Sequence, residues 1–277
     1  MDEELFCQEG GSIMRKKTKV WLITAASLVL VGCGLFAGVM AILQWDFMEL
    51  ETVKYETNTY AIREVFEGIS INTDTADLVF MPSDDGICKV VCHEEENAKH
   101  SVIVKDGTLT IDLLDERSFA YIGLNFDTPK ITVYLPETEY ASLLIKAITG
   151  NVCVKNLSFG TLDITVSTGK TDLTDLACKS LRSSGHTGDV YLNHVIAAEK
   201  LSIERSTGSV RFDDADATEI FVRTGTGDVT GSLLTDKVFL VQTGIGDVDV
   251  PLTADGGRCE IITGTGDVTI STKRIAE

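Results

Sequence analysis

The sequence predicts an all-β protein, a right-handed β-solenoid (β-helix) of ~19-residue coils, preceded by one N-terminal transmembrane helix. Three observations carry this prediction. The tetrapeptide Thr-Gly-Asp-Val, or a close relative of it, recurs through the C-terminal half of the chain. Apolar residues keep fixed offsets from each repeat glycine and lie two residues apart. A long uncharged run near the N-terminus directly follows a group of basic residues.

The repeat glycines set the period of the fold. Successive glycines are 19, 19, 20, 19, 19 and 20 residues apart, a spacing typical of a solenoid. Glycine reaches a positive φ without a Cβ clash, so each one is expected to mark a bend between two strands. The seven positions are Gly150, Gly169, Gly188, Gly208, Gly227, Gly246 and Gly266.

Four apolar columns accompany the glycines, seven and five residues before each one and two and four residues after it. A period of two predicts strands with one buried face. A single coil cannot bury that face, so we expect the coils to stack into a flattened tube filled by side chains. Leu162, Leu181 and Leu201, which share one column, should then lie on top of one another. The alternative is a β-sandwich, whose hairpins would reverse strand direction and would not keep four columns in phase.

The N-terminal region predicts a membrane anchor. Residues 1–19 form the expected cytoplasmic segment, and translation is expected to start at Met14, because Glu9-Gly10-Gly11 could be encoded by a ribosome-binding site. The uncharged run 20–43 would make a helix of about 36 Å, enough to cross a hydrocarbon core of about 30 Å. Four basic residues precede it, so the positive-inside rule places the N-terminus in the cytoplasm and the rest of the chain outside.

Two other interpretations of the apolar run stay open. A cleaved secretory signal has a shorter apolar core than this one. Leu30-Val31-Gly32-Cys33 resembles a lipobox, in which Cys33 would be lipidated after cleavage. The run continues apolar beyond Cys33, which favours an uncleaved, single-pass anchor in the cell membrane. All three interpretations place the C-terminal domain outside the membrane.

The rest of the chain divides into regions that differ in composition and periodicity. Residues 44–64 are polar and are expected to form a stalk. Residues 65–142 are expected to hold a divergent first coil, with Ala76 in the glycine position, and a strand-rich cap that includes a hairpin turn at Asp106-Gly107 and a loop over 114–128. Residues 143–273 carry the solenoid repeats, and residues 274–277 form a short tail.

Composition limits the partners and the chemistry. The formal net charge of −18 falls entirely on residues 44–277, because residues 1–43 hold four acidic and four basic residues. Such a domain repels nucleic acid and anionic headgroups. The seven cysteines include no Cys-x-x-Cys pair and suggest no disulfide framework, and Cys259 occupies a core column. Cys88, Cys92 and His93 do not form a metal motif, because adjacent strand residues face opposite sides.

One column of aspartates follows the repeat glycines. We expect these carboxylates to accept hydrogen bonds from backbone N–H groups in their own bends, as Asx turns do. A ladder of calcium ions is the alternative, although its known repeat is nine residues long and Lys170 occupies one position here. The column holds Asp189, Asp228, Asp247 and Asp267.

Signals for catalysis are weak. The four histidines have no metal-ligand spacing, and the glycine pairs are not followed by helices, so they are not nucleotide loops. We predict no catalytic, cofactor-binding or metal residues, no cofactor, and no enzyme activity. A polysaccharide-cleaving β-helix remains an alternative, but an obvious cluster of basic residues for a polyanionic substrate is lacking.

The coils, the segment Ile131-Thr132-Val133-Tyr134-Leu135-Pro136 and the single apolar span together resemble the DUF4097 family. The resemblance covers roughly residues 65–272 and implies a membrane-tethered β-solenoid of the kind described as a putative adhesin, widespread in Firmicutes. The resemblance implies no catalytic residues. The function expected is a cell-surface interaction module that binds a cell-wall polymer or another envelope protein. The alternative is an accessory or sensor component of cell-envelope stress signalling.

Overall fold

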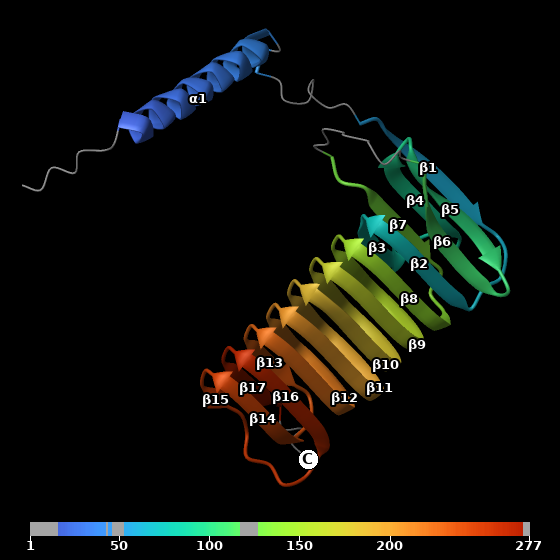
Figure 1. Ribbon diagram of the computed structural model, residues 1–277. Helices are drawn as coiled ribbons and strands as arrows, with labels where there is room; N and C mark the ends of the chain where they lie inside the picture. The colour runs from blue at the N-terminus through green and yellow to red at the C-terminus, as the bar shows by residue number, and fades with distance from the viewer. Residues whose placement is uncertain (1–15, 43, 46–52, 117–126, 274–277) are drawn as a thin grey trace, which may run out of the picture. The chain divides into compact units, whose positions relative to one another are not determined.

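The computed structural model describes residues 16–42, 44–45, 53–116 and 127–273 (Figure 1). The chain divides into two compact units, Met1–Thr52 and Val53–Glu277. The first contains helix α1 (Lys16–Ile42), which is long and apolar enough to cross a membrane by length and composition. The proposed start at Met14, the tail 274–277 and most of the expected loop 114–128 lie outside the described residues.

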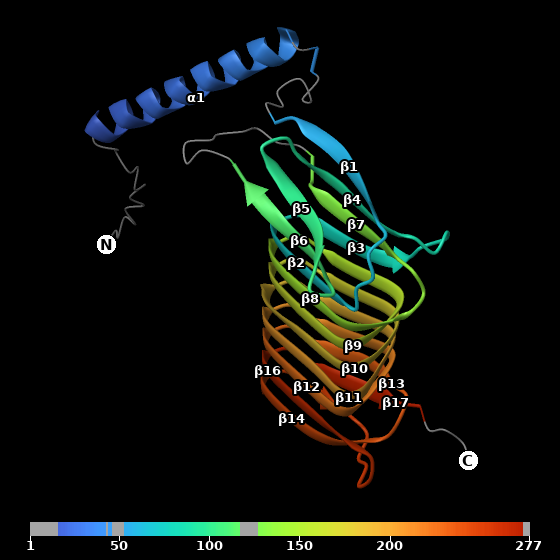
Figure 2. The same ribbon diagram turned by 90° about the vertical axis from the view of Figure 1, so that its right-hand side faces the viewer.

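The second unit is all-β, as predicted, and its strands belong to one continuous sheet that curls round a common core like a flattened barrel (Figure 2). The strands are β1 (Tyr55–Ile62), β2 (Gly68–Thr75), β3 (Asp77–Pro82), β4 (Cys88–Glu95), β5 (Ala98–Lys105), β6 (Thr108–Asp115), β7 (Lys130–Leu135), β8 (Glu139–Thr149), β9 (Val152–Thr168), β10 (Thr171–Thr187), β11 (Val190–Thr207), β12 (Val210–Thr226), β13 (Val229–Leu233), β14 (Lys237–Ile245), β15 (Val248–Asp249), β16 (Gly257–Thr265) and β17 (Val268–Thr272).

Parallel pairing in the middle of the domain follows the sequence period. Strands β9, β10, β11 and β12 are consecutive neighbours, and Leu181 lies in register with Leu162 on one side and with Leu201 on the other. The predicted stacking of these three leucines is therefore confirmed, and hairpins between these four strands are excluded. The three leucines are at most 1% exposed and belong to one apolar core that extends from Ile69 to Ile270.

The repeat glycines are required by the close approach of successive coils. All seven have φ between 132° and 150°, as the predicted bends demand. A Cβ atom on Gly188 would lie 2.0 Å from the carbonyl oxygen of Gly169 in the neighbouring coil, far inside van der Waals contact. Alanine is therefore excluded at this position by both its φ preference and its volume.

A second corner lies six residues after the glycine in four of the coils. There, one residue in the left-handed region turns an otherwise continuous strand. Asn, Asp and His tolerate this conformation better than other non-glycine residues. Asn156, Asp175, His194 and Asp214 occupy it, with φ between 51° and 54°.

Strands β2 and β3 form the first coil of the stack. Ile71 of β2 lies in register with Ile145 of β8, and Leu78 of β3 with Val152 of β9, which are the columns that the repeat predicts. On their other side, β6 and β7 pair with β2 and β3 in parallel. Antiparallel strands β5, β4 and β1 then close this end (Figure 1), and we call β1 and β4–β7 the cap.

The cap contains one confirmed turn and one correction. Asp106 and Gly107 both have positive φ and join β5 to β6, as predicted for a two-residue hairpin. The expected stalk over 44–64 is wrong for residues 55–62, which form strand β1 paired antiparallel with β4. This segment alternates and is rich in Thr and Tyr, which favour strands, and the free edge of β4 accepts it.

The coils are not stacked in chain order at the C-terminal end. Strand β12 pairs with β16 rather than β14, so the last coil (β16 and β17) is inserted before the penultimate one (β14 and β15). Strand β17 covers all five residues of β13, whereas β15 has only two residues and is followed by Pro251. Proline cannot donate to a ladder and is confined to edges, which explains why the coil that contains it lies outermost.

One polar position in the apolar columns is explained by a buried arginine. Ser183 occupies a column of Ile and Val, and its Oγ accepts a hydrogen bond from Arg205 at 2.8 Å. Arg205 also donates to Thr171 Oγ1 at 3.1 Å and to the carbonyl of Glu204 at 2.9 Å. Burial lowers the pKa of Arg205 to about 10. Cys259 is 1% exposed, as predicted, and the six cysteines among the described residues are free thiols.

Candidate functional site

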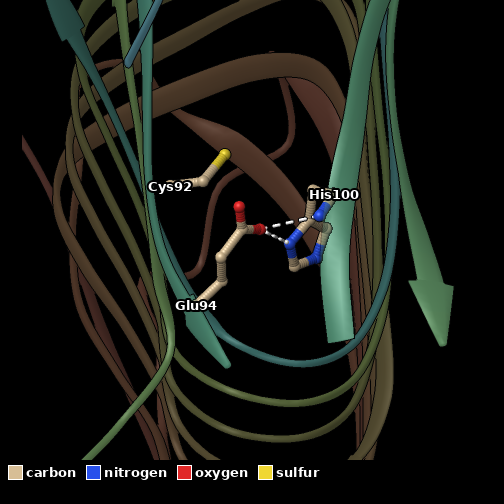
Figure 3. Close-up of side chains that lie close together, drawn as sticks. All are labelled: Cys92, Glu94 and His100. Carbon is tan, nitrogen blue, oxygen red and sulfur yellow. Dashed lines mark hydrogen bonds and ion pairs between the residues drawn. The ribbon is translucent and has the colours of Figure 1, made fainter. Parts of the chain in front are cut away.

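A buried group of three potential ligands lies inside the cap. Strand β4 alternates, so Cys92 and Glu94 face the interior together. The chain then turns at residues 96–97, and β5 returns with His100 facing the same space (Figure 3). The side chains of Cys92, Glu94 and His100 are at most 4% exposed. We call these three residues the cap cluster.

The cap cluster is held together by short contacts. The Oε2 atom of Glu94 lies 2.8 Å from Nδ1 of His100 and accepts a hydrogen bond from the backbone N–H of His100 at 2.7 Å. One sulfur, one carboxylate oxygen and one ring nitrogen lie within 4.8 Å of one another. Figure 3 shows the thiol of Cys92 and the carboxylate of Glu94 directed toward the same region as the imidazole ring.

Neighbouring strands orient two members of the cap cluster. Asn58 of β1 donates from Nδ2 to Oε1 of Glu94 at 2.9 Å, so both carboxylate oxygens are engaged. Thr73 of β2 places Oγ1 2.9 Å from Nε2 of His100. The imidazole therefore has a hydrogen-bonding partner at each nitrogen, and its ring orientation is fixed.

The electrostatics of the cap cluster favour the protonated form of Cys92. Burial opposes ionisation of Glu94, but the hydrogen bonds from His100 and Asn58 outweigh it and leave the pKa of Glu94 below its usual value. Burial, together with the nearby charge of Glu94, raises the pKa of Cys92 to about 12. The nucleophilic form of cysteine is the thiolate, so Cys92 in this state is a protonated, unreactive thiol.

The sequence predicts correctly that Cys92 and His93 face opposite sides of their strand, but it does not predict the cap cluster. His93 faces away from Cys92, as expected, and lies 2.8 Å from Asp127 and 3.1 Å from Thr57. No motif spacing in the sequence marks Glu94 or His100 as a site residue. The available signal was a glutamate at an inward-facing strand position, which requires a polar partner when it is buried.

The aspartate column is a ladder of hydrogen bonds between coils. We expected each carboxylate to accept from its own bend, and this is wrong, because Asp189, Asp228 and Asp267 accept from the equivalent backbone N–H of the neighbouring coil. Oδ1 of Asp228 accepts from the N–H of Asp267 at 2.9 Å, and Oδ1 of Asp267 accepts from Asp247 at 2.8 Å. Asp189 accepts from Ser209 in the same way at 2.9 Å. These bonds account for three of the four carboxylates without a cation.

The end of the stack opposite the cap exposes an apolar edge. Within the described residues, β14 pairs only with β16, so one side of its backbone has no strand partner. Leu240, Ile245 and Val248 are 49%, 72% and 47% exposed. Residues 238–245 contain neither a charged residue nor a proline. Natural proteins usually protect a free edge with such residues, so an unprotected one is typical of an interaction site.

A match to a family model over most of the folded domain shows the family of the chain. The family model described as Toastrack DUF4097 matches residues 66–276. The chain belongs to the Toastrack DUF4097 family. The resemblance inferred from the coils is thereby confirmed.

The Toastrack DUF4097 domain also resembles solved structures. A putative adhesin from Bacteroides fragilis is 20% identical, with 79% of this chain and 97% of that chain covered and a TM-score of 0.54, and so shares the fold. A putative adhesin from Parabacteroides distasonis is 16% identical over 80% and 98% of the two chains, with a TM-score of 0.43. A putative lipid binding protein from the same species is 16% identical over 81% and 98%, with a TM-score of 0.41. No curated protein matches the chain.

Proposed function

We propose that this Toastrack DUF4097 protein is a non-enzymatic, adhesin-like interaction module, anchored by α1 in the cell membrane with its β-domain outside. The basic residues before α1 support a cytoplasmic N-terminus. The parallel register of successive coils supports classing the domain as a β-solenoid, and crossovers between parallel strands are almost always right-handed. The enclosed position of the cap cluster supports a domain without catalytic activity.

The exposed edge of β14 is the observation that carries this proposal. Its free backbone groups and apolar side chains suit β-strand addition, in which a partner contributes an extended segment that continues the sheet. Asp247 and Asp249 flank the edge, and residues 44–277 carry the whole net charge of −18. The partner that fits is therefore an extended protein segment in which apolar residues alternate with Lys or Arg.

A peptide-binding experiment tests this function. A labelled nine-residue peptide of alternating Val and Lys is titrated into the β-domain, beside a peptide with Glu for Lys and one with a central proline. We expect saturable binding of the basic peptide alone, with slower amide exchange of residues 238–245. Leu240→Lys should weaken binding at least about tenfold, because it places a positive charge on the edge.

The matched control is Ile103→Lys, which adds the same charge at an equally exposed position in the cap. It should leave peptide binding unchanged. Equal effects of the two variants, or binding of the acidic peptide, would contradict the proposal. Reversible dimers formed without peptide would identify a second copy as the occupant, and binding only to cell-wall fragments would favour a wall polymer as the ligand.

A further inference from the structure

We propose that Cys92, Glu94 and His100 bind a single zinc ion that stabilises the cap. The first argument is the chemistry of the donors. A thiolate, an imidazole and a carboxylate are the three ligand types that zinc uses in proteins. Calcium and magnesium prefer oxygen ligands alone, so the sulfur and nitrogen donors favour zinc over them.

The second argument is geometric. Zinc lies about 2.0–2.3 Å from nitrogen, oxygen and sulfur ligands, so tetrahedral donors stand about 3.4 Å apart. The three donors of the cap cluster already lie within 4.8 Å of one another. Closing the site requires side-chain movements of about 1 Å, with the 2.8 Å contact between Glu94 and His100 opening to admit the ion.

The third argument is charge. The cap cluster is almost fully buried, and an uncompensated charge there is costly. On binding, the S–H bond of Cys92 breaks as a Zn–S bond forms, and the Nδ1–H bond of His100, which is directed at Glu94, breaks as a Zn–N bond forms. One proton is taken up by Nε2 of His100, which then donates to Thr73, and the other leaves to solvent. One Zn²⁺ with one thiolate, one carboxylate and a neutral imidazole has zero net charge, so the loaded site suits its environment.

The fourth argument is the surrounding shell. Metal-bound histidine usually donates its other ring N–H to a fixed acceptor, and Thr73 Oγ1 is in place beside Nε2 of His100. Asn58 orients the second oxygen of Glu94. A pocket of about 180 Å³, lined in part by Asp74, Leu113 and Pro129, reaches His100. It opens on the His100 side of the cap cluster, and Cys92 and Glu94 do not line it.

The test uses the full-length protein in detergent, stripped of metal with a chelator and titrated with Zn²⁺ or Co²⁺. We expect one equivalent of zinc bound, a rise in melting temperature with zinc, and a thiolate-to-cobalt absorption band with Co²⁺. Cys92→Ser should remove the band and weaken zinc binding more than about 100-fold, and Asn58→Ala should weaken it about 10–100-fold.

The matched control is Cys88→Ser. Cys88 lies on the same strand, is also buried, and has a pKa raised by burial to about 12, but it is outside the cap cluster. This variant should keep the band and the affinity. Loss of the band in both variants, or its retention in Cys92→Ser, would overturn the proposal.

A measurement on the unmodified chain covers the case in which Cys92→Ser fails to fold. Alkylation of each cysteine is followed by mass spectrometry in mild urea, with and without zinc. Zinc should slow modification of Cys92 far more than that of Cys178, which lies in the stack outside the cap and is also buried. If Cys92 is alkylated at the same rate with and without zinc, the cap cluster does not bind the ion and the proposal is wrong.

Discussion

Replacing Gly188 with alanine should be among the most damaging single-methyl additions in this domain. The new Cβ would stand 2.0 Å from the carbonyl oxygen of Gly169, and the residue would be held at a φ of 132°. Strain at such a φ costs about 1–3 kcal/mol for a non-glycine residue. Relieving the overlap requires the coils of Gly169 and Gly188 to separate locally, which weakens the hydrogen bonds that join them, from the N–H of Gly169 to Thr187 and from the N–H of Thr171 to Asp189, each 2.9 Å long. At about 1 kcal/mol for each bond, the total loss is about 3–5 kcal/mol.

Urea unfolding of a Val53–Glu277 fragment, followed by circular dichroism, measures this loss, because that unit contains the whole β core. The control is Gly86→Ala, at φ 69° with no atom within 4 Å of the added Cβ. This variant should lower the free energy of unfolding by about 1–2 kcal/mol, because only the positive φ is unfavourable for alanine there. If Gly188→Ala is no more destabilising than Gly86→Ala, the close packing of coils through glycine is not what sets the period.

Three further predictions concern the stack. Leu181→Ala should lower the free energy of unfolding by about 2–5 kcal/mol in the same assay, while Leu252→Ala, at a fully exposed position, should change it by less than about 0.5 kcal/mol. Asp228→Ala should cost about 1 kcal/mol, because the N–H of Asp267 loses its acceptor, whereas Asp228→Asn keeps an acceptor and should cost less; equal losses would refute the ladder. The hydrogen bonds of Asp214 with Lys273 and Ser232 hold its pKa below the usual range, so their stabilisation is present above pH about 4 and is lost as the pH falls through the folded-state pKa. Asp214→Asn should flatten the dependence of stability on pH between 6 and 3, and an unchanged slope would count against the pair.

The sequence by itself determined the repeating part of this protein. A regular fold imposes the same environment on every coil, so the columns and the glycines are visible as periodic letters, and the register of Leu162, Leu181 and Leu201 follows from spacing alone. The apolar run of α1 and the Asp106-Gly107 turn are likewise local signals. Each depends on residues that are neighbours in the chain or are separated by a constant step.

Only the tertiary structure decided the parts that break the period. The insertion of β16 and β17 before β14 depends on a comparison between two coils with the same repeat pattern. A short strand and Pro251 place one of them at the edge. The aspartates join neighbouring coils because the stack brings a second row of N–H groups within reach, which no single bend reveals. The cap cluster arises where a hairpin places His100 opposite Glu94 and two other strands enclose both. Its members share no period and no motif spacing, so only the packing of separate strands could bring them together.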